Sequence, residues 1–114
     1  ALFEPEQLFQ LSSSDFQTAL SMRSNEVTVE AVIEAAHDML CPLGINYSAW
    51  RLACGVMGRH AAALCVLLLD ANRDHPQTPV RNAGGALRGM IRAHQRGKLN
   101  LVGSMIGLQR RRGF

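Results

Sequence analysis

The sequence predicts an all-α fold, a compact bundle of about five to seven short helices with one buried central helix. Apolar residues recur at the 3.6-residue helical period from residue 28 onward, and no stretch shows a competing strand alternation. Residues 61–69 are apolar without interruption, which is typical of a helix that other helices surround. A chain of 114 residues with 47% hydrophobic content is long enough to form one domain with its own core.

The first 27 residues are weakly patterned. Pro5 is placed to open a short helix through Leu11, and Ser13 or Ser14 to cap another through Met22. We expect residues 1–27 to be an N-terminal arm or linker remnant. Residues 28–114 are then the helical domain.

The helical pattern sharpens at Thr28, which is expected to be an N-cap. Apolar residues follow at helical spacing as far as Leu40. Pro42 and Gly44 are expected to end this helix.

Ser48 is expected to cap the next helix, over residues 49–57, and Gly58 separates it from the one that follows. Residues 59–71 are apolar on most faces, so we expect them to form the central helix. Residues 72–79 contain two prolines and are expected to form a loop.

The last two helices are predicted over residues 83–96 and 101–109. Asn82 is the expected N-cap of the first, and Gly97 takes the left-handed position after its end. The inner stripe of the first helix is expected to consist of Leu87, Met90, Ile91 and His94. The second is expected to bury Leu101, Val102, Met105, Ile106 and Leu108.

Charge is divided unevenly along the chain. All nine acidic residues lie within residues 1–74 against four arginines, a net charge of −5. Residues 75–114 hold eight basic residues and no acid, a net charge of +8. A surface of one sign attracts partners of the other sign. The alternative is that the acidic and basic parts face each other, within the fold or between copies.

The basic residues of the last third follow a helical row. Arg88, Arg92 and Arg96 are spaced i, i+4, i+8, which aligns three guanidinium groups along one helix face. No aromatic residue interleaves with them in the sequence, so we expect contacts to phosphates and not base reading. The residues expected to contact DNA are Arg81, Asn82, Gly84, Gly85, Arg88, Arg92, Arg96, Lys98, Arg110, Arg111 and Arg112.

The glycines at the start of the same helix have two interpretations. Behind Asn82, Gly84 and Gly85 leave backbone N–H groups exposed at the positive helix end, where a phosphate binds well. Alternatively, these glycines, with Gly89, Gly103 and Gly107, allow close helix packing. The two interpretations are compatible.

No residue pattern points to catalysis or to a bound group. The four histidines are scattered and the glycines do not match a phosphate-binding loop, so we expect neither an enzyme nor a cofactor. His37 and Cys41 are spaced for one helix face, but two ligands are too few for a metal site. Three cysteines without a CxxC pair predict free, buried thiols in the reducing cytoplasm. We expect no secretory signal and no membrane span.

Residues 32–108 resemble the C-terminal region of the RepC-type replication initiators of repABC plasmids. Three pieces carry the resemblance, in the same order: LGINYSAW at 43–50, MGRHAAALCVLLLDA at 57–71 and VRNAGGALRGMIRAHQRGKLNL at 80–101. The third piece departs from the family's pattern at Ala83, where proline is common, and at Ala86, where tyrosine is common. The positions that match the family's motif are Arg81, Asn82, Gly84, Gly85 and Arg88.

The resemblance implies initiation of plasmid replication at an origin, by binding DNA and assembling the host replication machinery. Members carry a winged-helix origin-binding region toward their N-terminus, so this chain would be the separated C-terminal domain. It would contribute contacts to the phosphate backbone of origin DNA. The alternative is a protein-interaction module for self-association, or for recruitment of a host helicase or primase component.

Overall fold

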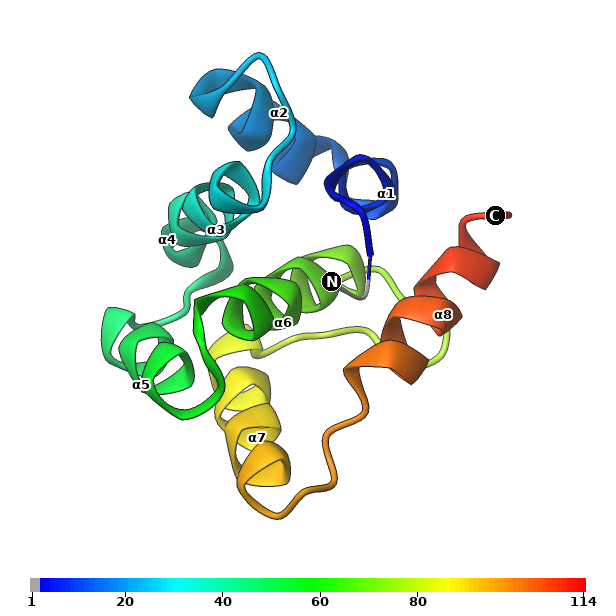
Figure 1. Cartoon of the computed structure of the whole chain (residues 1–114). Coiled ribbons are helices and arrows are strands. Elements are labelled where there is room, and N and C mark those ends of the chain that lie inside the picture. Colours follow the sequence, from blue (N-terminus) through cyan, green and yellow to red (C-terminus); the bar gives the residue numbers. More distant parts are fainter. Residues whose placement is uncertain (1–2) are drawn as a thin grey trace.

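A computed structural model describes residues 3–114, and within them the chain forms eight helices and no strand (Figure 1). The helices are α1 (Pro5–Leu11), α2 (Ser14–Arg23), α3 (Val29–Asp38), α4 (Leu40–Leu43), α5 (Tyr47–Met57), α6 (Arg59–Ala71), α7 (Ala83–Gln95) and α8 (Leu101–Arg111). The all-α prediction is confirmed, with a helix count slightly above the predicted five to seven.

The additional helix is α4, which sequence reasoning merged into the helix before it. α3 ends at Asp38, and the next residue, Met39, is both its C-cap and the N-cap of α4. Pro42 therefore lies in the first turn of a new helix, where a missing N–H costs nothing, and does not end the old one. Gly44 ends α4 in the left-handed conformation, with φ of +70°.

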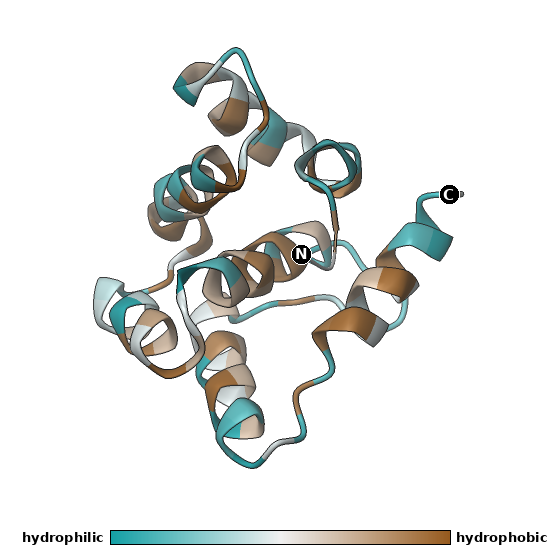
Figure 2. Ribbon diagram, viewed as in Figure 1, coloured by the Kyte–Doolittle hydropathy of each residue, from teal (hydrophilic) through white to brown (hydrophobic). Residues whose placement is uncertain are grey.

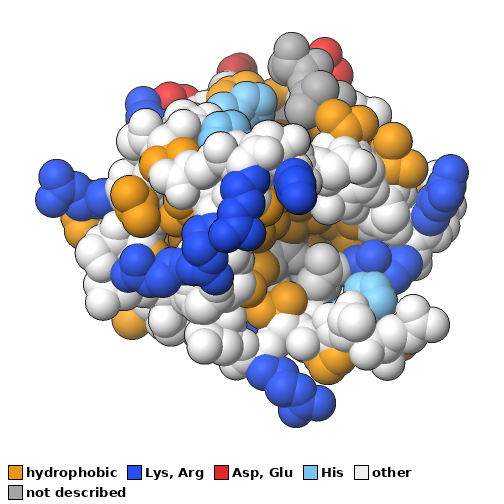
Figure 3. All heavy atoms as spheres, turned by 90° about the horizontal axis from the view of Figure 1, so that it is seen from below, with side chains coloured by type: hydrophobic (Ala, Val, Ile, Leu, Met, Phe, Trp, Pro, Cys, Tyr) orange, Lys and Arg blue, Asp and Glu red, His pale blue; other side chains and the backbone are white. Residues whose placement is uncertain are grey.

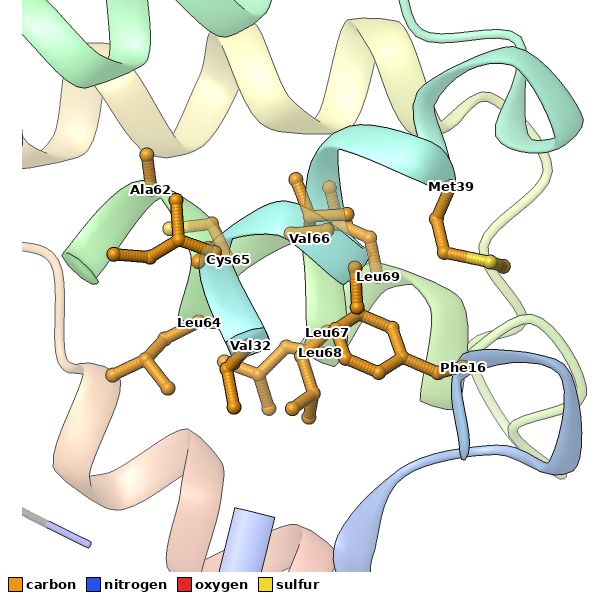
Figure 4. Close-up of a cluster of buried hydrophobic side chains, with 14 of the residues drawn as sticks. Phe16, Val32, Met39, Ala62, Leu64, Cys65, Val66, Leu67, Leu68 and Leu69 are labelled. Atoms are coloured by element: carbon orange, nitrogen blue, oxygen red, sulfur yellow. The ribbon is translucent and has the colours of Figure 1, made fainter. Parts of the chain in front are cut away.

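The prediction of a buried central helix is confirmed by α6. Residues 62–71 are all buried, and α3, α5, α7 and α8 each pack on this helix. Figure 2 shows that its ribbon is almost entirely hydrophobic, whereas the surrounding helices have one hydrophobic side. Figure 4 shows side chains of α6 meeting Phe16, Val32 and Met39 in one apolar cluster. Within residues 3–114, no helix is long and apolar enough to cross a membrane.

The N-terminal segment contributes to the same core. Leu8 and Leu11 of α1 and Phe16 and Leu20 of α2 are buried, and α2 packs along α3. Ser13 is the N-cap of α2, because its Oγ accepts a hydrogen bond from the N–H of Phe16 at 3.1 Å. Residues 3–27 are thus part of one packed unit with the helices that follow.

Local capping signals place most helix boundaries. Thr28 and Asn82 cap α3 and α7, as the sequence predicts, and Gly97 has a φ of +69°. The prediction that Ser48 caps α5 is wrong. Asn46 is in the extended conformation and its Oδ1 accepts from the N–H of Ser48, so the helix starts two residues earlier. The Ser48 hydroxyl is therefore free for another contact.

Three side chains predicted to be buried are exposed. α8 packs on α6 through Met105 and Leu108, and no helix within residues 3–114 covers its flank, so Val102 is 41% and Ile106 39% exposed. His94 is exposed because α7 faces the core with Ala83, Leu87 and Ile91.

The cysteines differ from one another in their environments. All three are free thiols, but Cys41 is exposed, so the prediction that it is buried is wrong. It lies in the short α4, on the side of that helix that is exposed. Cys65 is buried in α6, and burial raises the pKa of its thiol to about 12. Burial also raises the pKa of the half-buried Cys54.

Candidate nucleic-acid interface

The arginine row of α7 follows directly from the buried stripe of that helix. Arg88 and Arg92 each come one residue after a core residue, Leu87 or Ile91, and so lie about 100° around the helix from the core. Arg88 Nη2 donates a hydrogen bond to Ser48 Oγ of α5 at 3.4 Å. The row therefore begins on the flank of α7 that lies next to α5, and its arginines are exposed.

The row continues past the end of the helix. Arg96 is the C-cap residue of α7, and Lys98 follows the left-handed Gly97. Both side chains are exposed, as is Arg81 just before the helix begins. The basic residues predicted around α7 thus form one exposed series along its length.

One of the free backbone N–H groups at the N-terminus of α7 is occupied by the helix's own cap and is not available to an anion. Asn82 Oδ1 accepts a hydrogen bond from the N–H of Gly85 at 3.0 Å. This leaves the N–H groups of Ala83 and Gly84 for an anion, and Ala83 is buried. Asn82 and Gly85 are therefore a matched capping pair, in addition to any contact with phosphate.

Gly84 lies against another segment of the chain, but at an ordinary contact distance. A methyl group at Gly84 would lie 3.5 Å from the carbonyl oxygen of Gly44, so the start of α7 packs on the α4–α5 connection with room for alanine. At Gly85 and Gly103 a methyl group would meet the side chain of the helix's own cap, Asn82 or Asn100. Gly107 has no other atoms within 4 Å of that position. Close packing between helices therefore does not explain these glycines.

The C-terminal arginines lie at a different place from the row. Arg111 donates a hydrogen bond to Asn72 Oδ1, at the end of α6. Arg111 and Arg112 also line a surface hollow of about 290 Å³ with Asp74 and His75. In Figure 1 the end of α8 and the end of α7 point to opposite sides of the molecule. The predicted DNA contacts thus fall into two groups: the α7 row, and Arg110–Arg112.

The acidic and basic parts of the chain do not pair within the fold. All five ion pairs in residues 3–114 join residues of the first 74, for example Arg59 with Glu30 at 2.5 Å and Arg23 with Asp38 at 2.5 Å. None of the eight basic residues after position 74 forms an ion pair within the described part of the chain. Figure 3 shows the result, with basic side chains across this face and acidic ones at its edge.

An exposed aromatic residue lies next to the arginine row, which sequence reasoning missed. Tyr47 is the residue before Ser48, the partner of Arg88, and its side chain is 55% exposed. Its ring meets the ring of His37 edge to face, with centroids 5.6 Å apart. The sequence does contain this aromatic residue, in the segment INYSAW. Its position beside α7, however, depends on packing between residues 40 positions apart.

A shallow hollow opens beside this aromatic pair. It has a volume of about 530 Å³ and is lined by His37, Leu40, Cys41, Gly44, Ile45, Asn46 and Tyr47. Arg51, four residues after Tyr47 on α5, is exposed and lies on the adjoining helix face. The surface of α5 thus connects the hollow to the arginine row.

The fold and its surface define an all-helical domain with a basic face whose side chains form no ion pair within residues 3–114. Residues 12–111 match the family described as replication protein C, C-terminal region. The chain belongs to this family, which confirms the resemblance found in its sequence. No curated protein and no solved structure matches the chain significantly.

Proposed function

We propose that this domain binds DNA through its phosphates during initiation of replication at a plasmid origin. The supporting observation is the set of exposed basic residues after position 74, none paired with an acid in the described chain. Unpaired cations on one face raise the local concentration of a polyanion. Because the chain belongs to a replication-protein family, DNA is the polyanion that we propose as its partner.

Within this surface, the α7 row is the better candidate for the main contact. Arg88 and Arg92 project from the same side of a regular helix, so their spacing is fixed. Arg111 and Arg112 line a hollow with Asp74, and Arg111 engages Asn72, which lowers the net attraction of these two arginines for a phosphate. Contacts of this kind position a protein on DNA but carry no sequence information.

Fluorescence anisotropy with labelled duplexes of unrelated sequence, at several salt concentrations, tests the proposal. The double variant Arg88→Ala/Arg92→Ala should bind all sequences more weakly. The slope of log affinity against log salt should fall by about 0.9 for each phosphate that the variant no longer neutralises. Unchanged affinity, or a loss confined to one sequence, would contradict the proposal.

The double variant Arg110→Ala/Arg112→Ala is the matched control, because it removes the same charge from the other end of the basic surface. It should lower the salt slope less than the α7 variant does. Equal effects of the two variants would mean that net charge, and not the row, governs binding.

A second candidate function is a protein-interaction module, and the exposed flank of α8 favours it. Val102 and Ile106 are spaced i, i+4 and form an apolar strip on the surface. Charge pairing between copies has less support, because five of the nine acidic residues already pair with Arg23, Arg59 or Arg73. Self-association, or recruitment of a helicase or primase component, would then rest on apolar contact.

Light scattering without nucleic acid separates the two candidates. A molecular mass that rises with concentration, and that Ile106→Gln returns to that of a monomer, supports the module. A constant monomer mass at all concentrations argues against self-association through α8.

A further inference from the structure

We infer that the surface formed by α5 and α7 binds single-stranded DNA, with a base stacked on Tyr47 and the adjoining phosphates held by Arg51 and Arg88. This inference rests on the proposed function, and it adds the strand type and the residue that contacts a base. It joins one exposed aromatic side chain to cations on two helices.

Tyr47 has the properties of a stacking platform. It is the first residue of α5, the residue is 55% exposed, and its contact with His37 is edge to face at 81°. That contact fixes the direction of the ring without covering it by a parallel stack. His37 is itself held against Trp50, which is almost fully buried, at 6.3 Å between centroids. The exposed ring is therefore supported by the core.

The cations continue directly from this platform. Ser48 follows Tyr47 in the chain and accepts the hydrogen bond from Arg88, so the guanidinium lies over the first turn of α5. Arg51 is one helical turn after Tyr47 on the outer face of α5 and forms no ion pair in the described chain. A strand with its base on Tyr47 has positive charge on the side toward α7.

The acids near this surface are partly neutralised. Asp38 and Glu34, on the helix that carries His37, both pair with Arg23, at 2.5 and 3.3 Å. A polyanion approaching the hollow beside Tyr47 thus meets less repulsion than two free carboxylates would exert. The hollow itself is lined by both apolar and polar groups, which suits the flat faces and polar edges of a base.

The combination favours a single strand over a duplex. In a duplex the base faces are covered by their neighbours, so an aromatic side chain on the protein surface has nothing to stack on. Single-strand binding combines cations along the backbone with aromatic rings that accept any base. Duplex DNA would use the arginine row alone.

The test compares three labelled ligands with equal label and buffer: a thymidine oligomer, an abasic oligomer of the same length and a duplex. Anisotropy is measured for the unaltered chain, Tyr47→Ala, Tyr47→Phe and Met22→Ala. Met22 is 83% exposed on α2 and serves as a control for loss of an exposed apolar side chain elsewhere. Thermal unfolding checks that each variant is folded.

The unaltered chain should bind the thymidine oligomer more tightly than the abasic one. Tyr47→Ala should weaken binding of the thymidine oligomer by about 5- to 150-fold, the range for loss of one base–aromatic stack. Affinity for the abasic oligomer and the duplex should stay the same. Tyr47→Phe keeps the ring and should bind normally, as should Met22→Ala.

Two outcomes overturn the inference in distinguishable ways. If all three ligands bind with salt dependence and Tyr47→Ala changes none of their affinities, the stacking role is contradicted and the proposed phosphate binding is not. If no ligand binds even at low salt, the proposed function is contradicted as well. Photo-crosslinking with an oligomer containing 5-iododeoxyuridine adds a second readout, with the crosslink expected in the peptide that contains Tyr47.

Discussion

The hydroxyl of Ser13 donates a hydrogen bond to the carboxylate of Asp70, which joins the start of α2 to the end of the central helix. The Asp70 side chain is fully buried, with Oδ1 2.7 Å from Arg73 Nη2. That contact is an ion pair without hydrogen-bond geometry, so Oδ1 has no hydrogen-bond partner in the described chain. Ser13 is thus the one hydrogen-bond donor to this carboxylate within residues 3–114.

Replacing Ser13 by alanine should destabilise the domain by about 2 kcal/mol. The change removes the N-cap of α2, worth about 1 kcal/mol, and leaves a buried carboxylate without its donor, which costs about 1–3 kcal/mol. Urea unfolding followed by circular dichroism measures the difference in free energy.

Ser14→Ala is the matched control for this substitution. Ser14 is exposed, and its side chain forms no hydrogen bond in the described chain, so it should change the free energy of unfolding by less than about 0.5 kcal/mol. Equal losses from the two variants would show that the Ser13–Asp70 contact does not stabilise the fold.

Local signals explain why the helices were predictable. Thr28 and Asn82 cap helices through contacts within three residues, and Gly97 needs only its own backbone conformation. The predicted start of α5 was wrong because Asn46, two residues before Ser48, also belongs to a residue type that caps helices. Sequence does not say which side chain reaches the free N–H.

Properties that depend on neighbouring helices were not predictable in the same way. Val102 and Ile106 have the correct spacing for burial, and their exposure follows from the absence of a helix over that flank of α8. Tyr47 adjoins the arginine row because α5 packs on α7, a relationship that links positions 48 and 88. The uneven distribution of charge along the chain was readable from the sequence. That the basic residues of the last third fall into two groups, the α7 row and Arg110–Arg112, required the fold.

The ion pair between Arg23 and Asp38 predicts that the stability of the fold depends weakly on pH in the acid range. The hydrogen bond from Arg23 lowers the pKa of the Asp38 carboxyl in the folded protein. The pair therefore stabilises the fold above the ordinary pKa of aspartate, about 3.9, and this contribution is lost as the pH falls through the lowered value. The effect should be small because the pair is exposed and screened by solvent.

Unfolding free energies measured between pH 2 and 6 test this dependence. Asp38→Asn should flatten the acid limb of the curve, whereas Glu26→Gln, at an exposed residue without an ion pair in the described chain, should leave it unchanged. An Asp38→Asn curve that runs parallel to that of the unaltered chain would refute the assignment.

Replacing each of two glycines by alanine should change the stability of the domain in opposite directions. Gly89 is inside α7, and a methyl group there would meet only Arg92 Nη2, at 3.7 Å, so Gly89→Ala should stabilise the domain by about 1 kcal/mol. Gly44 has a φ of +70°, so Gly44→Ala should destabilise it by about 1 kcal/mol despite the open space around it. Thermal unfolding gives both signs, and destabilisation by Gly89→Ala would mean that this glycine serves a close contact.

The three thiols should differ in their rates of alkylation. Cys41 is exposed and should react with iodoacetamide first, and the half-buried Cys54 should follow more slowly. Cys65 should react only when the domain unfolds, because it is buried and its thiol has a pKa of about 12. Mass spectrometry of peptides after timed labelling gives the order, and early labelling of Cys65 would contradict the packing of α6.

The same labelling reports on the hollow beside Tyr47, because Cys41 lies in its wall. A saturating thymidine oligomer should slow the alkylation of Cys41, since a base on Tyr47 obstructs the thiol. The labelling of Cys54 should keep its rate, which controls for a general obstruction of the thiols. Cys65 should react more slowly with either oligomer, because it is labelled only in the unfolded state and a bound ligand stabilises the folded one. An abasic oligomer at the same degree of saturation should protect Cys41 less. Equal protection by both oligomers would place the phosphates, and not a base, over the hollow.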